Sequence, residues 1–132
     1  MSRIFALSEA SSIAIHSMVI IARSPEGINA AKISEITGLS RNHIAKVLQR
    51  LVKIDMLKSV RGPAGGFTLK ADPATITLLD IYQAIEGNID ISDCPLAYDV
   101  CGFDHCLMGN VINHLTSEFK DFLNEKTLKS YI

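Results

Sequence analysis

The sequence contains no tryptophan and only three cysteines among its 132 residues, and aromatic residues make up just 6% of it. It also has no apolar run of the roughly 18 residues that a membrane span needs, and Glu9 and His16 interrupt any signal-peptide core near the N-terminus. A small, odd number of cysteines argues against a secreted fold held by disulfides. We therefore expect a cytoplasmic protein without a membrane partner, in which reduced cysteines form a metal or redox site.

Charge is unevenly distributed along a chain that otherwise has the composition of one globular domain, with 48% hydrophobic and 20% charged residues. Residues 1–70 carry ten Lys and Arg against four Asp and Glu, whereas residues 71–132 carry three against ten, so the halves have net charges of +6 and −7. A basic half of this size favours binding to a polyanion, because cations that meet phosphates release condensed counterions. The alternative, from charge alone, is an uneven solvated surface.

Two helices are predicted in the first part of the basic half. Apolar residues recur at helical spacing from about Ser8 to Arg23, and the turn-forming residues 24–27 end this helix. Asn29 can cap a short second helix that ends at Gly38.

A third helix begins at Ser40 and has two different faces. Its apolar residues recur at i, i+3, i+4 and i+7 and predict a buried stripe of Ile44, Val47, Leu48 and Leu51. The opposite face carries amides and cations: Asn42, His43, Lys46, Gln49, Arg50 and Lys53. A short helix, a turn and such a helix form the helix-turn-helix pattern, whose second helix enters the major groove of DNA. An ordinary solvated face is the alternative, but the turn length and the basic half favour DNA binding.

Two short strands around the tip from Arg61 to Gly66 predict a β-hairpin. The glycines of the tip allow a tight turn and a close approach to another surface. Beside a helix-turn-helix, such a hairpin is a wing that can lay Arg61 along the minor groove, where negative potential attracts a guanidinium. A phosphate-binding loop is excluded because the tip lacks the Lys-Ser/Thr ending and the strand-to-helix context of that motif.

The second half of the chain combines an acidic cysteine segment with a long amphipathic helix. Thr77 is expected to cap a fourth helix that ends at Gly87, and residues 86–104 contain five acids, two cysteines and no Lys or Arg. A last helix is expected to begin near Cys106, with a seam spaced four, three, four and three residues apart: Met108, Ile112, Leu115, Phe119 and Phe122. This repeat is compatible with packing on the helix's own domain or on a second copy, and the need for two DNA half-site contacts favours a homodimer.

The run from Ser59 to Phe67, SVRGPAGGF, resembles the wing signature of the IscR/NsrR type of bacterial regulators, the Rrf-two family. The acidic stretch with three cysteines and the last residues, from Phe122 onward, resemble it as well. The resemblance implies a mainly α fold with a small β-hairpin: a winged helix-turn-helix region (1–77), then a cysteine loop and a long C-terminal dimerisation helix (78–132). It also implies a homodimeric transcription factor that binds a palindromic operator in double-stranded DNA.

The resemblance assigns DNA contacts to the first turns of the third helix and to the wing. The candidate residues are Ser40, Arg41, Asn42, His43, Lys46, Arg50, Arg61 and Gly62. In the IscR branch a Glu-Gln pair contributes to operator discrimination, whereas Ala45 and Lys46 stand at those places here, so a different operator is expected. Lys46 can bind either a guanine or a phosphate.

Cys94, Cys101 and Cys106 are separated by six and then four residues and are the candidate metal ligands. Thiolates are soft ligands suited to iron-sulfur clusters and to zinc, and a flexible loop can bring three of them to one site. The resemblance favours an iron-sulfur cluster. Because the cysteine spacing differs slightly from that of the family, both 2Fe-2S and 4Fe-4S clusters remain open.

A fourth ligand is needed, and four residues are candidates. The IscR branch uses a histidine at the position that is Gly109 here. Related regulators use an acid or a histidine from the first helix of the partner subunit, which makes Glu9 and His16 candidates, with Asp104 and His105 as local ones. The favoured interpretation of His16 by itself is a partly buried polar residue on an apolar helix.

Three other functions compete with a cluster sensor. The same winged-helix regulator can use a thiol switch or a zinc site in place of a cluster. An enzyme would use a cysteine nucleophile with His105 or His114 as base, but the sequence offers no convincing acid–histidine pair, so we expect neither catalysis nor a small-molecule substrate. The third is an interaction module that uses its winged helix for protein contact without DNA, and a weak salt dependence with no preference for duplex DNA would favour it.

Overall fold

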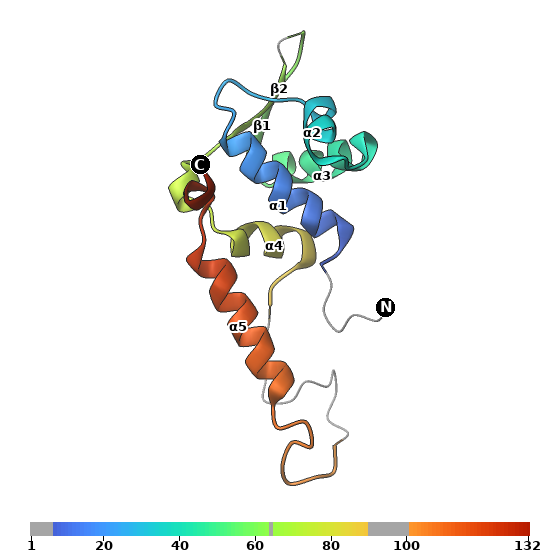
Figure 1. The fold of residues 1–132 in the computed structure, drawn as a ribbon, viewed down its shortest axis with the longest axis vertical. Helices are drawn as coiled ribbons and strands as arrows, with labels where there is room; N and C mark the ends of the chain where they lie inside the picture. The colour runs from blue at the N-terminus through green and yellow to red at the C-terminus, as the bar shows by residue number, and fades with distance from the viewer. Residues whose placement is uncertain (1–6, 64, 90–100) are drawn as a thin grey trace.

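The structure, a computed structural model, describes residues 7–63, 65–89 and 101–132. Within these ranges the chain forms five α-helices, one antiparallel hairpin and two short 3-10 turns (Figure 1). The elements are α1 (Glu9–Ala22), α2 (Ala30–Thr37), α3 (Arg41–Lys53), β1 (Leu57–Val60), β2 (Gly66–Leu69), η1 (Pro73–Thr75), α4 (Leu78–Glu86), α5 (Val111–Glu125) and η2 (Leu128–Tyr131). The mainly helical winged fold predicted from the sequence is confirmed.

Capping residues set the starts of the first four helices. The side chains of Ser8, Asn29, Ser40 and Thr77 each accept a hydrogen bond from the backbone N–H three residues further on. This satisfies one of the donors that a helix start leaves without an intrahelical partner. The four predicted caps are confirmed, and Gly38 ends α2 in the left-handed conformation, with a φ of 77°.

One apolar core joins α1 to α3, α4 and the hairpin. The side chains that are fully or almost fully buried in it are Ile13, Met18, Ile21, Ile33, Ile44, Val47, Leu48, Leu51, Leu57, Ile81 and Leu128. Full burial of one such side chain stabilises a fold by about 1.5–3 kcal/mol. The predicted core stripe of α3 lies entirely within this set, and it therefore fixes which face of α3 remains outside.

The hairpin pairs Leu57 with Leu69 at one end and Val60 with Gly66 at the other. A bridge between Ile28 and Phe67 holds it to the segment before α2, with backbone hydrogen bonds of 3.2 and 2.8 Å. The wing therefore belongs to the same packed body as the helix-turn-helix.

Helix α5 begins at Val111, five residues later than predicted. Gly109 and Asn110 both adopt positive φ values, 61° and 57°, and such left-handed residues cannot continue a right-handed helix. Met108 therefore lies in the turn before the helix rather than on its seam.

Figure 1 shows α5 extending away from the body formed by the other helices. Its C-terminal end is anchored by the buried Leu123 and by an edge-to-face contact between Tyr82 and Phe119, with ring centroids 5.3 Å apart. In the described part of the chain, no helix combines the length and apolar character needed to cross a bilayer.

Candidate nucleic-acid interface and cysteine site

The turn between α2 and α3 is held by side-chain hydrogen bonds. The Ser34 hydroxyl donates to the Leu39 carbonyl at 2.6 Å, and the Leu39 N–H donates to the Thr37 hydroxyl at 3.2 Å. Together with the left-handed Gly38, these bonds set the direction in which α3 leaves the turn. The geometry is that of a helix-turn-helix.

The outward face of α3 consists of exposed polar and cationic side chains. The exposed members are Arg41, Asn42, Lys46, Gln49, Arg50 and Lys53. Asn42 and Lys46 lie one helical turn apart, opposite the buried stripe, and Ser40 stands exposed at the N-cap. The structure therefore presents an amide and a cation side by side at the start of α3.

Two of the predicted DNA-contacting residues, His43 and Arg50, lie on the flank of α3 and have partners inside the protein. The half-buried His43 places Nδ1 3.2 Å from Oε1 of Glu9. Arg50 Nη2 donates to the Ile85 carbonyl at 3.2 Å. These residues are seven apart, about two helical turns, so both face the junction with α1 and α4. The sequence pattern groups them with the outward face, but α3 turns them toward its neighbours.

The tip of the wing is exposed at Arg61, Gly62 and Pro63. A Cβ atom on Gly65 would lie 2.2 Å from the Val60 carbonyl oxygen and 2.8 Å from that of Gly62. The tip therefore requires glycine at position 65 because no side chain fits there. This packing holds the backbone beside Arg61 in one tight turn.

The two described cysteines, Cys101 and Cys106, are half-buried and are not in a disulfide, and Cys94 lies outside the described residues. Asp104 and His105 are exposed between them and contact each other, with Nδ1 and Oδ1 2.9 Å apart. Within the described ranges, no group of three or more Cys, His, Asp and Glu is arranged to hold a metal ion. The two thiols are chemically suited to a cluster or to zinc, and the proposed third ligand is not among the described residues.

The two candidate ligands on α1 point in different directions. Glu9 contacts His43 of α3, as described above. His16 is exposed rather than partly buried, and its Nδ1 lies 2.6 Å from the Ser12 carbonyl oxygen. The sequence-based interpretation of His16 as a partly buried residue is therefore wrong, because it lies at the open edge of a groove.

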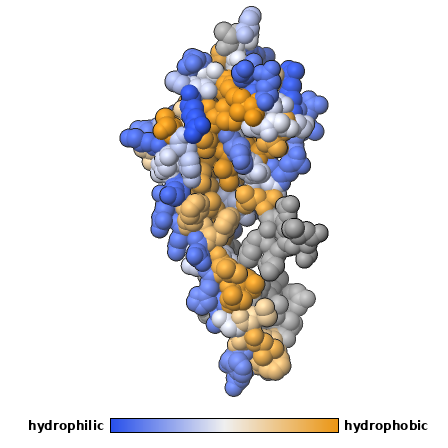
Figure 2. Space-filling model, in the orientation of Figure 1, coloured by the Kyte–Doolittle hydropathy of each residue, from blue (hydrophilic) through white to orange (hydrophobic). Residues whose placement is uncertain are grey.

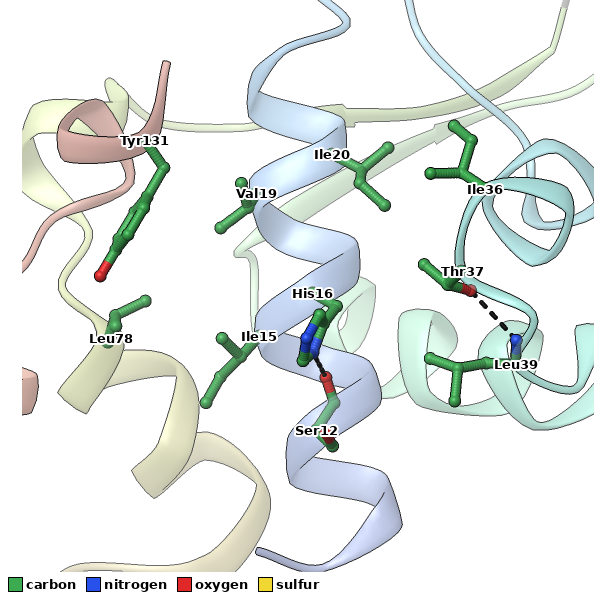
Figure 3. A pocket seen from close by; sticks show the side chains of 10 residues that line it. All are labelled: Ser12, Ile15, His16, Val19, Ile20, Ile36, Thr37, Leu39, Leu78 and Tyr131. Carbon is green, nitrogen blue, oxygen red and sulfur yellow. Dashed lines mark hydrogen bonds between the residues drawn. The ribbon is translucent and has the colours of Figure 1, made fainter.

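This groove has a volume of about 630 Å³ and lies along α1 (Figure 3). Its walls come from α1, the end of α2, the start of α4 and the C-terminal residues, and most of its surface is apolar. The lining residues are Ser12, Ile15, His16, Val19, Ile20, Ile36, Thr37, Leu39, Leu78 and Tyr131. The groove could not be predicted from the sequence because its residues come from four separate segments.

A second apolar surface runs along α5. Its exposed members are Val111, Leu115, Phe119 and Phe122. Figure 2 shows apolar side chains gathered in a band that extends down this face of the molecule, bordered by hydrophilic residues. Three of the four predicted seam residues that fall within α5 are thus exposed, and only Ile112 is half-buried.

An exposed amide-and-cation helix after a tight turn, with an arginine-bearing hairpin packed on the same body, defines a winged helix-turn-helix DNA-binding protein. The sequence profile of the Rrf2 family, described as "Iron-dependent Transcriptional regulator", matches residues 7–132. The chain therefore belongs to the Rrf2 family of transcriptional regulators and is not an enzyme.

Named relatives and solved structures agree with this assignment. The chain is 33% identical to the HTH-type transcriptional regulator IscR of Vibrio vulnificus over 94% of its own length and 70% of the relative's. It is 31% identical to IscR of Escherichia coli over 87% of its own length and 72% of the relative's.

The fold matches that of CymR (YrzC), the global cysteine regulator of B. subtilis, with a TM-score of 0.80 at 22% identity over 98% of this chain and 99% of the other. It matches T. potens IscR with a TM-score of 0.75 at 25% identity over 95% and 84% of the two chains.

Proposed function

We propose that this regulator is a homodimer that binds a palindromic operator and adjusts its affinity through a site held by Cys94, Cys101 and Cys106. The observation that carries the proposal is the placement of the outward face of α3 and the wing on one packed body. In this proposal, residues 1–77 bind DNA, and residues 78–132 sense the signal and form the dimer.

Base and phosphate contacts are proposed for the N-terminal turns of α3. Ser40, Arg41, Asn42 and Lys46 are exposed there and would lie in the major groove, with Lys46 on a guanine or a phosphate. Arg61, with Gly62 beside it, would enter the adjacent minor groove. His43 and Arg50 retain a place in the proposed interface, but their partners in α1 and α4 favour a role through the orientation of α3.

The homodimer is supported by the apolar band. Phe122 has 51% of its surface exposed and Leu115 38%, and a monomer would leave both in water together with the groove beside α1. Contiguous exposed apolar surface of this kind marks interaction sites. A two-fold dimer covers the same surface on both copies and places two recognition helices on the two half-sites of a palindrome.

The sensor is supported by the chemistry of the cysteines and by the family. Cys101 and Cys106 would hold an iron-sulfur cluster, of 2Fe-2S or 4Fe-4S type, together with Cys94, and Glu9, His16, Asp104 or His105 would complete the set. A bound cluster would supply a redox-sensitive link between the three cysteines and the residue that provides the fourth ligand. A coupling of about 1–3 kcal/mol between this site and the DNA site would change operator affinity about 5- to 150-fold.

A thiol switch or a zinc site is the second candidate for the sensor. Two half-buried thiols that are not in a disulfide are compatible with reversible oxidation. One solved structure with this fold, at 22% identity and a TM-score of 0.74, is described as the oxidised form of Staphylococcus aureus CymR.

The decisive experiment measures iron, acid-labile sulfide and zinc per subunit, with an absorption spectrum, on protein purified without oxygen. Matching amounts of iron and sulfide, lost in Cys101→Ser while the dimer persists, would support the cluster. A Cys101→Ser protein that keeps all its iron would refute this ligand set. Zinc, or no metal, would favour the second candidate and leave the DNA-binding proposal standing.

The DNA site is tested with a duplex that the wild-type protein selects from a random-sequence pool. Arg61→Ala should weaken binding to it by about 1–3 kcal/mol. Lys129→Ala removes one exposed positive charge outside α3 and the wing and serves as the charge-matched control. Equal affinities of the two variants would contradict the wing contact.

A further inference from the structure

The N-terminus of α1 and the C-terminus of α4 meet at the carboxylate of Glu86. The hydroxyl of Ser11, which is fully buried, donates to Glu86 Oε1 at 2.6 Å. The hydroxyl of Ser8, which caps α1, donates to the same oxygen. One carboxylate, from the last residue of α4, therefore receives hydrogen bonds from the first turn of α1.

The recognition helix joins this junction through its flank. Arg50 of α3 donates to the carbonyl of Ile85, the residue before Glu86, at 3.2 Å. Two helical turns earlier, His43 of α3 contacts Glu9, the residue after the Ser8 cap. Three helices thus meet through polar groups that the apolar core does not include, and two of these groups, His43 and Arg50, belong to the flank of α3.

The charge of Glu86 suits this position. Hydrogen bonds from Ser11 and Ser8, with the nearby charge of Arg50, lower the pKa of Glu86 below its ordinary value, although burial acts in the opposite direction. A negative charge is also favourable at a helix N-terminus such as that of α1. Gly87, with a φ of 87°, ends α4 directly after Glu86, and the chain then continues toward Cys94.

We infer that Glu86 is a positioning residue for DNA recognition: its carboxylate ties α1 to α4 and, with Arg50, sets the angle at which α3 is presented to DNA. The inference rests on the proposed function, because it assumes that α3 binds DNA. Glu86 itself touches no DNA in this arrangement.

The direction in which a substitution at Glu86 changes the affinity for DNA distinguishes a positioning role from a simple effect of charge. Glu86→Gln removes one negative charge, and charge alone would tighten binding to a polyanion. Loss of positioning predicts the opposite, a weakening of about three- to tenfold. Glu86→Asp keeps the charge but withdraws the carboxylate by one methylene, and it should weaken binding in the same way.

The test measures the affinity of each variant for the duplex selected by the wild type, by fluorescence anisotropy. Thermal unfolding and sedimentation confirm that each variant is folded and associates like the wild type. Glu26→Gln, at an exposed residue in the turn between α1 and α2, makes the same charge change and should leave affinity unchanged or slightly higher. Binding by Glu86→Gln and Glu86→Asp that equals or exceeds that of the wild type would overturn the inference.

A double-mutant cycle with Arg50→Gln tests whether Glu86 and Arg50 act together. If they form one junction, adding Arg50→Gln to Glu86→Gln should cause little further loss of DNA affinity. The slope of log affinity against log salt concentration should also stay the same. Additive losses, with a salt slope reduced by about one in Arg50→Gln, would instead make Arg50 a direct phosphate contact and refute the junction. If the wild type selects no duplex at all, the proposed function fails rather than this inference.

Discussion

Substitution of Gly65 by alanine tests the structure of the wing at the point where it is most closely packed. A new Cβ would lie 2.2 Å from the Val60 carbonyl oxygen, 2.8 Å from that of Gly62 and 2.9 Å from the Arg61 carbonyl carbon. Real Cβ atoms essentially never come within 3.0 Å of such atoms. All three neighbours are backbone, so the turn beside Arg61 must open.

The expected effect is large on DNA binding and small on folding. The tip is exposed and makes few core contacts, so the free energy of unfolding should fall by only about 1 kcal/mol. Displacement of Arg61 from its proposed groove should weaken binding by about 1–3 kcal/mol, the same loss that is expected for Arg61→Ala. We expect Gly65→Ala and Arg61→Ala to have similar affinities for the duplex selected by the wild type.

Fluorescence anisotropy and urea denaturation measure the two quantities separately. Pro63→Ala is the matched control, since it changes the same exposed tip without adding a Cβ atom, and its affinity should stay within about 0.5 kcal/mol of the wild type. A folded Gly65→Ala protein that bound the duplex as tightly as the wild type would refute the reasoning.

Three further predictions concern stability and assembly. Ser17 Oγ is buried and has no hydrogen-bond partner among the described residues. Ser17→Ala should therefore leave the free energy of unfolding, measured by urea denaturation, unchanged or raise it by up to about 1 kcal/mol. A clear loss of stability would contradict this prediction. Leu123 is 4% exposed and Phe122 is 51% exposed. Leu123→Ala should therefore lower the free energy of unfolding by about 2–5 kcal/mol, whereas Phe122→Ala should mainly weaken self-association, as measured by sedimentation equilibrium. The reverse pattern would reject the proposed dimer face. Hydrogen bonds from Ser11 and Ser8 lower the pKa of Glu86 below 4.5, so the ionised carboxylate stabilises the fold above that pH. This contribution is lost as the pH falls through the lowered pKa, and the difference in unfolding free energy between the wild type and Glu86→Gln should therefore narrow in acid. A difference that widens in acid would contradict this sign.

The local features of the fold could be predicted from the sequence because they depend on neighbours in the chain. The caps Ser8, Asn29, Ser40 and Thr77 bind backbone groups only three residues away. The apolar stripe of α3 follows from helical periodicity alone. The glycines of the wing follow from what a tight turn requires. The start of α5 was missed because the left-handed pair at Gly109 and Asn110 was not recognised.

The roles of side chains at helix flanks could not be predicted in this way, because they depend on contacts between distant segments. His43 and Arg50 match the outward face of α3 by composition, yet Glu9 and the Ile85 carbonyl, 34 and 35 residues away, are their partners. The groove along α1 likewise needs residues as far apart as Ser12 and Tyr131. The sequence by itself thus determined the helices, the wing and the family resemblance, whereas only tertiary packing decided which polar residues face solvent and which join one helix to another.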